Sequence, residues 1–240
     1  MNYLSLRWAV GVAMGLGVGA LGGCGLISSD VTNFDLTLPD KKFSVDAQSW
    51  DVTDQEAQQV LTTNCSANPG LCNAAAEAAC PMNCGGECNA TTQTCDLSLD
   101  VSLYQGVDLL MEKPELQSIN DEPVIKVEID SVTWEVTSNT LNTATPPMTV
   151  FVAPMSVMDP TSPDAKPVGT IDSVAAGEVT DAPRQIAFTA NGKAELIAAM
   201  STFKTPFNVI VGSTIVVTSG QTFPQGKLDA VVHIKGHAGL

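Results

Sequence analysis

Six cysteines lie within 31 residues, and this cluster constrains the fold more than any other feature of the chain. Their spacing is C-x6-C-x7-C-x3-C-x3-C-x6-C. A segment this short cannot bury a core of its own, so a cysteine density of this kind is typical of chain that disulfides hold together. Because six is an even number, we expect three disulfides, with all 15 connectivities open. The predicted disulfide residues are Cys65, Cys72, Cys80, Cys84, Cys88 and Cys95.

A structural zinc site is the alternative interpretation of the cluster. The last four of these cysteines have spacings within the usual range for zinc thiolates. That assignment leaves Cys65 and Cys72 without partners, and an oxidising compartment favours disulfides over thiolates. We therefore assign no metal ligand to the chain. No cofactor-binding residue and no catalytic residue is assigned either.

The seventh cysteine, Cys24, ends a segment with the layout of a secretory signal. A single positive charge at Arg7 precedes an uncharged apolar stretch from Trp8 to Gly23. The last four residues of the segment are Leu21-Gly22-Gly23-Cys24. This run resembles the lipobox of bacterial lipoprotein precursors. An ordinary cleaved signal or an uncleaved anchor is the alternative.

The resemblance implies that residues 1–23 are a cleaved signal peptide and that Cys24 is the lipid-attachment residue. In that family, the cysteine thiol receives a diacylglyceryl group and the new amino group is acylated, which gives stable membrane anchoring through acyl chains. Removal of Arg7 leaves 10 basic and 26 acidic residues, a charge of -16. Residue 25 is glycine; in Gram-negative members an aspartate there favours retention in the inner membrane. The resemblance therefore implies the outer membrane, on its periplasmic face or at the cell surface.

The charge balance of the whole chain excludes one class of partner. The 240 residues contain 11 Lys+Arg against 26 Asp+Glu, a formal charge of -15. Nucleic-acid binding depends on basic side chains that displace counterions from phosphates, so we expect no nucleic-acid partner. A hydrophobic content of 44% is ordinary for a globular protein. The acidic residues are therefore expected to keep a folded protein soluble at the envelope.

Residues 24–33 are expected to form a lipid-anchored tether, and residues 34–96 a module of short strands, a helix and the cysteine cluster. Alternating apolar residues on either side of the polar stretch 39–42 predict a weak hairpin. Thr53 and Glu56 have the spacing of a capping box, which predicts a helix that ends near Thr63. The run 73–79 predicts a second helix, and Gly85-Gly86 predicts a turn.

From residue 97 onward, apolar and polar residues alternate with the period of a β-strand. The parity changes between Ile129 and Val132, which predicts a bulge near Asp130-Ser131 or a strand that passes between sheets. One amphipathic helix is expected near 192–203. Further strands are expected at 148–153, 168–174, 184–189, 207–211, 213–218 and 228–235. Residues 97–240 are thus predicted to form one β domain.

The fold class that follows is mainly β. We predict an antiparallel β-sandwich, Ig-like or similar, preceded by a small disulfide-rich helical module. An open sheet with the helix on one face is the alternative.

Only two histidines occur, His233 and His237. In the last expected strand, His233 falls on the face opposite the apolar residues, and His237 lies beyond Gly236, where we expect the strand to end. No G-x-S-x-G nucleophile motif is present. The sequence therefore favours a non-enzymatic envelope lipoprotein, a binding or scaffolding module whose partners are the membrane, through Cys24, and an envelope protein or polymer. The alternative is an envelope hydrolase or metal-dependent enzyme that uses Asp/Glu or the two histidines.

Overall fold

A computed structural model describes residues 34–80, 82–119, 121–122 and 124–239 of the chain. The fold is mainly β, and the described residues belong to one compact unit. The strands are β1 (Phe34–Asp35), β2 (Lys41–Asp46), β3 (Cys84–Cys88), β4 (Cys95–Val107), β5 (Lys126–Asn139), β6 (Met148–Pro154), β7 (Lys166–Ile171), β8 (Arg184–Gln185), β9 (Ala187–Phe188), β10 (Phe207–Val217) and β11 (Lys227–Gly239). The helices are α1 (Asp54–Thr62), α2 (Leu71–Ala79), α3 (Leu109–Glu112) and α4 (Gly192–Ser201), with short 3-10 turns η2 (Ala47–Trp50) and η3 (Pro114–Ile119). Among the described residues, no helix is long and apolar enough to span a bilayer.

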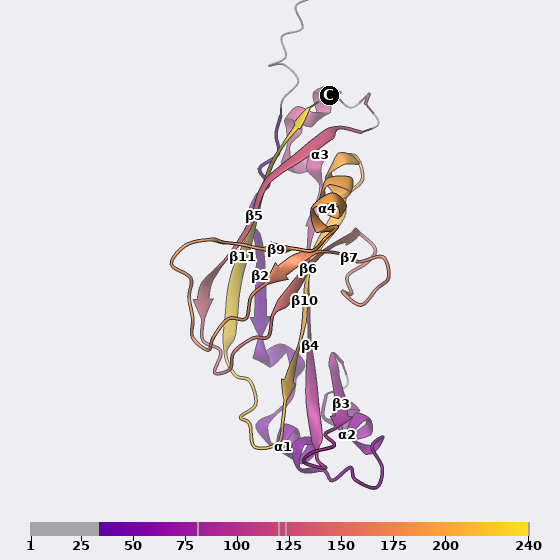
Figure 1. The fold of residues 1–240 in the computed structure, drawn as a ribbon, viewed down its shortest axis with the longest axis vertical. Helices are drawn as coiled ribbons and strands as arrows, with labels where there is room; N and C mark the ends of the chain where they lie inside the picture. Colours follow the sequence, from indigo (N-terminus) through magenta and orange to yellow (C-terminus); the bar gives the residue numbers. More distant parts are fainter. Residues whose placement is uncertain (1–33, 81, 120, 123, 240) are drawn as a thin grey trace, which may run out of the picture. The chain divides into compact units, whose positions relative to one another are not determined.

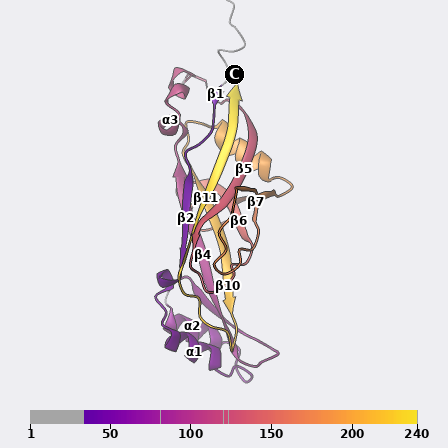
Figure 2. The ribbon, with the colours of Figure 1, turned by 90° about the vertical axis from the view of Figure 1, so that its left-hand side faces the viewer.

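The strands form two antiparallel sheets (Figures 1 and 2). Sheet 1 has the order β1-β11-β5-β8, with β2 also paired to β11. Sheet 2 has the order β3-β4-β10-β6-β7-β9. Inward side chains of both sheets line the same apolar space: Phe43, Trp134 and Val232 come from sheet 1, and Leu103, Met148 and Val211 from sheet 2. The two sheets therefore share one core, which leaves their outer faces available for function.

The predicted bulge in β5 is confirmed. Lys235 of β11 pairs with Ser131, whereas the next residue, Gly236, pairs with Ile129, so that Asp130 is the extra residue. The bulge keeps both Ile129 and Val132 in the core. The expected end of the last strand at Gly236 is wrong, because β11 continues to Gly239.

The expected hairpin between residues 34 and 45 is wrong. Both β1 and β2 pair with β11, through Phe34 with Ala238 and Lys41 with Val232. Between them, Leu38 donates its backbone N–H to the carbonyl of Ile234 at 2.9 Å. Residues 34–46 thus form one edge of sheet 1, because long β11 offers a hydrogen-bonding partner along its whole length.

Four further expectations differ from the structure. Gly85-Gly86 lies inside β3 rather than in a turn. The stretches 207–211 and 213–218 form one strand, β10, while 184–189 is divided between β8 of sheet 1 and β9 of sheet 2. The expected boundary at residue 97 falls inside β4, and β1, β2 and β3 belong to the two sheets. The segment that was expected to precede the β domain therefore contributes strands to both of its sheets.

The expected helices are present. The Thr53 hydroxyl accepts from the Glu56 backbone N–H at 3.3 Å, and the Glu56 carboxylate accepts from the Thr53 backbone N–H at 2.9 Å, which is the predicted capping box at the start of α1. The second expected helix is α2. Helix α4 contacts β5, β6 and β7 and ends at Ser201, two residues before the expected end. Its Leu196 and Met200 are buried, as is Phe203 just beyond it.

The six clustered cysteines form three disulfides, as expected: Cys65–Cys88, Cys72–Cys95 and Cys80–Cys84. The first two connect residues 23 apart, and the third connects residues four apart. They attach α2 and the chain around it to β3 and β4. The zinc interpretation is not the arrangement found, because the four cysteines it required are divided among these three disulfides.

We expect the disulfides to stabilise the protein unequally. Loop-closure entropy assigns about 3.4 kcal/mol to a loop of about 23 residues and about 2 kcal/mol to one of about four. Replacing both Cys72 and Cys95 by serine should therefore lower the free energy of unfolding by more than replacing both Cys80 and Cys84. Urea denaturation of the two double variants measures the difference. Equal losses of unfolding free energy in the two double variants would contradict this difference. Reactive thiols at any of these six positions in the unreduced, denatured wild-type protein would contradict the disulfides themselves.

Candidate functional site

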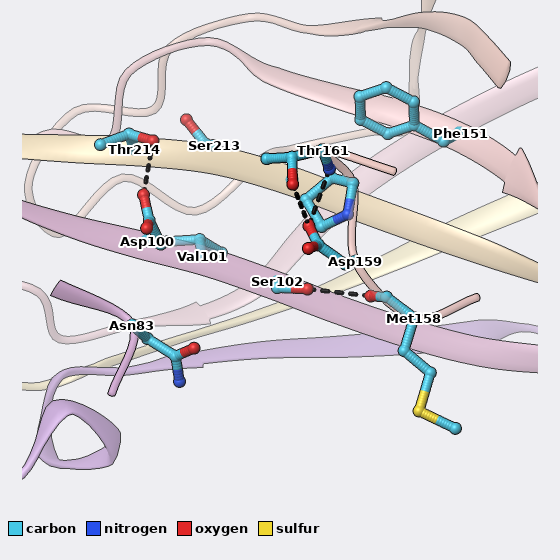
Figure 3. A pocket seen from close by; sticks show the side chains of 12 residues that line it. Asn83, Asp100, Val101, Ser102, Phe151, Met158, Asp159, Thr161, Ser213 and Thr214 are labelled. Carbon is cyan, nitrogen blue, oxygen red and sulfur yellow. Dashed lines mark hydrogen bonds between the residues drawn. The ribbon is translucent and has the colours of Figure 1, made fainter. Parts of the chain in front are cut away.

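A cavity of about 500 Å³ opens on the outer face of sheet 2, and we call it the outer cleft (Figure 3). Its floor is formed by β4 and β10, and its walls by the β6–β7 loop and by the residue before β3. The lining residues are Asn83, Asp100, Val101, Ser102, Phe151, Met158, Asp159, Pro160, Thr161, Gly212, Ser213 and Thr214. Residues from three distant regions of the sequence, 83–102, 151–161 and 212–214, therefore meet at one site.

The floor consists of two cross-strand pairs, Asp100 with Thr214 and Ser102 with Gly212. Asp100 and Ser102 face outward because the residues that alternate with them on β4 are in the core. The Thr214 hydroxyl donates to Asp100 Oδ1 at 2.8 Å. A Cβ at Gly212 would lie 2.5 Å from the Pro160 Cβ, so only glycine lets the loop approach the floor this closely.

The β6–β7 loop is fastened to the sheet. Asn208, which is 1% exposed, donates its side-chain amide to the carbonyls of Met155 at 3.1 Å and Val157 at 2.8 Å. The Ser102 hydroxyl donates to the carbonyl of Met158 at 3.0 Å. Beneath the loop, a small apolar cluster comprises Ala153, Ala165 and Ile210, with Phe151 and Val157 packed against it. These contacts give the loop a fixed position, so the cleft has a preformed wall.

The disulfide-rich segment supplies the opposite wall. Asn83 lies within the loop that the Cys80–Cys84 disulfide closes, and it has a left-handed backbone conformation with φ of 61°, which asparagine tolerates better than most residues. Its carbonyl accepts from the Asp100 backbone N–H at 2.8 Å. The carbonyl of Asp100 in turn accepts from the indole N–H of buried Trp50 at 3.0 Å. The backbone of Asp100 is therefore held from both sides.

The outer cleft is acidic and rich in acceptors. Asp159 Oδ1 accepts from both the backbone N–H and the hydroxyl of Thr161, each at 2.8 Å. These hydrogen bonds, the backbone one first, hold the pKa of the Asp159 carboxyl below its ordinary value. Within the described part of the chain, the Oδ2 atoms of Asp100 and Asp159 accept no protein hydrogen bond. The lining contains no lysine, arginine or histidine, so both carboxylates face the cleft without a cation.

The two serine hydroxyls of the cleft are not arranged as nucleophiles. Ser102 donates to the Met158 carbonyl, and Ser213 donates to the Pro147 carbonyl at 3.0 Å. A serine nucleophile requires a neighbouring base that takes its proton. The geometry of the cleft thus suits the binding of a ligand that donates hydrogen bonds or carries positive charge.

The two histidines lie outside the cleft, on the outer face of sheet 1. His233 contacts Asp40 through Nδ1 at 2.8 Å and Glu135 through Nε2 at 3.3 Å. Its position opposite the apolar face of β11 agrees with the prediction. In this arrangement the two carboxylates contact opposite nitrogens of one ring, so they do not converge with a single ring nitrogen on one metal position.

His237 repeats the arrangement with its own carboxylates. Its Nδ1 lies 3.1 Å from Asp130 Oδ1, at the bulge of β5, and its Nε2 lies 3.5 Å from Glu128 Oε2. Because strand β11 continues past Gly236, His237 keeps the same face as His233. The structure therefore gives each histidine a separate carboxylate pair and does not bring the two rings to one common centre.

The other residues singled out from the sequence fall into two groups. The six clustered cysteines are structural, and Cys80–Cys84 also supports a wall of the cleft. Cys24, the lipobox and the tether lie outside the described residues. No family model, curated protein or solved structure matches the chain.

Proposed function

We propose that the protein is a lipid-anchored lipoprotein of the cell envelope, delivered to the outer membrane, whose body is a non-enzymatic binding or scaffolding module. The observation that carries the proposal is the use of cysteine. The three disulfides pair all six cysteines of residues 34–239, which is the usage expected in an oxidising compartment. The remaining cysteine of the chain is Cys24, the residue at which the lipobox resemblance implies lipid attachment.

The body is proposed to be a β-sandwich, Ig-like or similar. Two antiparallel sheets that contribute side chains to one core favour this architecture. A sandwich is a rigid scaffold that presents loops and sheet faces to partners. The outer cleft is a site of this kind, because its floor is a sheet and its loop wall is fastened to that sheet.

Binding is favoured over catalysis by the chemistry of the cleft. Its serine hydroxyls donate to backbone carbonyls, and its two carboxylates lie in a shallow, acceptor-rich space. The alternative, an envelope hydrolase or metal-dependent enzyme that uses His233 and His237, receives less support, because each ring bridges its own carboxylates on a different sheet from the cleft. We therefore assign recognition to the outer cleft.

Mass spectrometry of the protein isolated from native envelopes tests the anchoring. We expect the mature chain to begin at Cys24 and to carry acyl chains, because two or more chains are what stable anchoring requires. The Cys24→Ser variant should leave the membrane fraction. Mature material that retains Met1, or a Cys24→Ser variant that stays membrane-bound through alkaline carbonate washing, would contradict the proposal.

A further inference from the structure

We propose that the outer cleft binds a cationic side chain, foremost arginine, from a basic segment of another exported protein. This inference rests on the proposed function, because an anchored envelope body meets its partners outside the cytoplasm. It adds the chemistry of the ligand: positive charge, several hydrogen-bond donors and an aliphatic stem. Each of these properties matches a feature of the cleft.

Charge is the first match. Asp100 and Asp159 both line the cleft, and within the described part of the chain the Oδ2 atom of each is available to a ligand. No basic residue belongs to the lining, and the whole chain carries a charge of -15. A cationic segment would therefore be attracted over long range as well as at the site.

The second match is the placement of the acceptors. Asp100 and Ser102 are two residues apart on one face of β4, a separation of about 7 Å. Ser102 donates to the carbonyl of Met158, and Asp159 follows Met158 directly, so that one carboxylate comes from the floor and the other from the loop wall beside it. Figure 3 shows both beside β10. A planar guanidinium has five N–H donors and can donate to several acceptors of the lining at once, more than an ammonium with its three donors.

The third match is the apolar part of the lining. Phe151 is half-buried, and Met158 is 47% exposed at the loop. Such side chains pack against the aliphatic stem of arginine, and an aromatic face also attracts its guanidinium. A glycan fits less well, because the two described tryptophans, Trp50 and Trp134, are buried in the core, and Tyr104, which is 46% exposed on β4, does not line the cleft.

Titration with two short peptides tests the inference. We would use the full chain, purified with its native disulfides in non-ionic detergent, and the probes Ac-Gly-Arg-Gly-Arg-Gly-NH2 and the same peptide with citrulline in place of arginine. Citrulline keeps the shape and removes the charge. Calorimetry at low salt should show the arginine peptide binding at least about tenfold more tightly than the citrulline peptide, since one charge-assisted hydrogen bond contributes that much.

Substitutions locate the site. We expect Asp100→Asn and Asp159→Asn each to weaken binding of the arginine peptide by about tenfold, since each removes one charge from the cleft. Asp181→Asn is the matched control: it removes the same charge from an exposed residue outside the cleft lining, and it should leave affinity unchanged within about twofold.

Three results of the peptide titrations would overturn the inference. These are equal affinity for the arginine and citrulline peptides, no loss in either cleft variant, and a loss in Asp181→Asn as large as in Asp100→Asn. Calcium that binds at the cleft and is unaffected by the arginine peptide would also overturn it, in favour of a metal. The mass of the mature protein reports the lipid anchor independently, so failure of the cleft inference and failure of the proposed anchoring give different results.

Discussion

Replacement of Glu112 by alanine is expected to lower the free energy of unfolding by about 3 to 5 kcal/mol, because it leaves a buried ammonium without its counterion. Lys41, at the start of β2, is only 6% exposed. Its Nζ lies 2.6 Å from Glu112 Oε1, in α3, and 3.4 Å from the carbonyl of Gly106. Urea denaturation followed by far-UV circular dichroism measures the change.

The size of this effect follows from where the pair lies. Side-chain exposure is 7% for Lys41 and 17% for Glu112, so solvent screens their attraction much less than it screens a surface pair. The pair also connects an edge strand of sheet 1 with the segment that follows β4 of sheet 2. Nearby, Gln105 donates its amide to the carbonyl of Lys42 at 3.0 Å, which joins the same two regions. Loss of Glu112 is therefore expected to loosen this junction between the sheets.

A double variant separates the buried charge from the lost contact. Lys41→Met combined with Glu112→Leu removes both charges and keeps apolar volume, and such exchanges are often neutral or stabilising. We expect the double variant to recover most of the stability that Glu112→Ala loses. A single variant that loses less than about 1 kcal/mol, or a double variant no more stable than the single one, would show that the pair is screened by solvent.

The features that could be predicted from the sequence are those whose partners lie close together in the chain. Thr53 and Glu56 are three residues apart, so their capping box is visible as a local pattern. The bulge at Asp130 is visible because it reverses the parity of the buried residues within one strand. The outward position of His233 follows from the same alternation, but its contacts with Asp40 and Glu135 do not, since both partners come from distant strands or loops.

The features that could not be predicted depend on contacts between distant segments. The partner of residues 34–46 is β11, nearly two hundred residues later, and nothing local distinguishes this pairing from a hairpin. The outer cleft joins Asn83, Asp100 and Asp159 from three separate parts of the chain. The disulfide connectivity was equally open, because six cysteines allow 15 pairings. The sequence contained one signal for the cleft. Asp100 and Ser102 alternate with the buried residues of β4, which places both on the outward face of that strand.

Gly86 is a second position at which we expect a large effect, and sequence alone suggested a different role for it. A Cβ at Gly86 would lie 2.0 Å from the backbone carbonyl oxygen of Cys72 and 2.4 Å from its carbon. Backbone atoms of α2 cannot move aside as a flexible side chain would. Gly86→Ala should therefore destabilise the protein by about 3 kcal/mol or more, because α2 must separate from β3.

The neighbouring glycine provides the control. A Cβ at Gly85 would meet only the Ser98 Cβ at 4.0 Å, an ordinary contact, so Gly85→Ala should change stability by less than about 0.5 kcal/mol. The separation of α2 from β3 in Gly86→Ala should also impair formation of Cys72–Cys95, whose first cysteine is in α2 and whose second begins β4. Thermal unfolding and thiol labelling of the unreduced variants measure both effects. Equal stability of the two variants would mean that α2 does not pack on Gly86 as described, since only that contact distinguishes the two glycines.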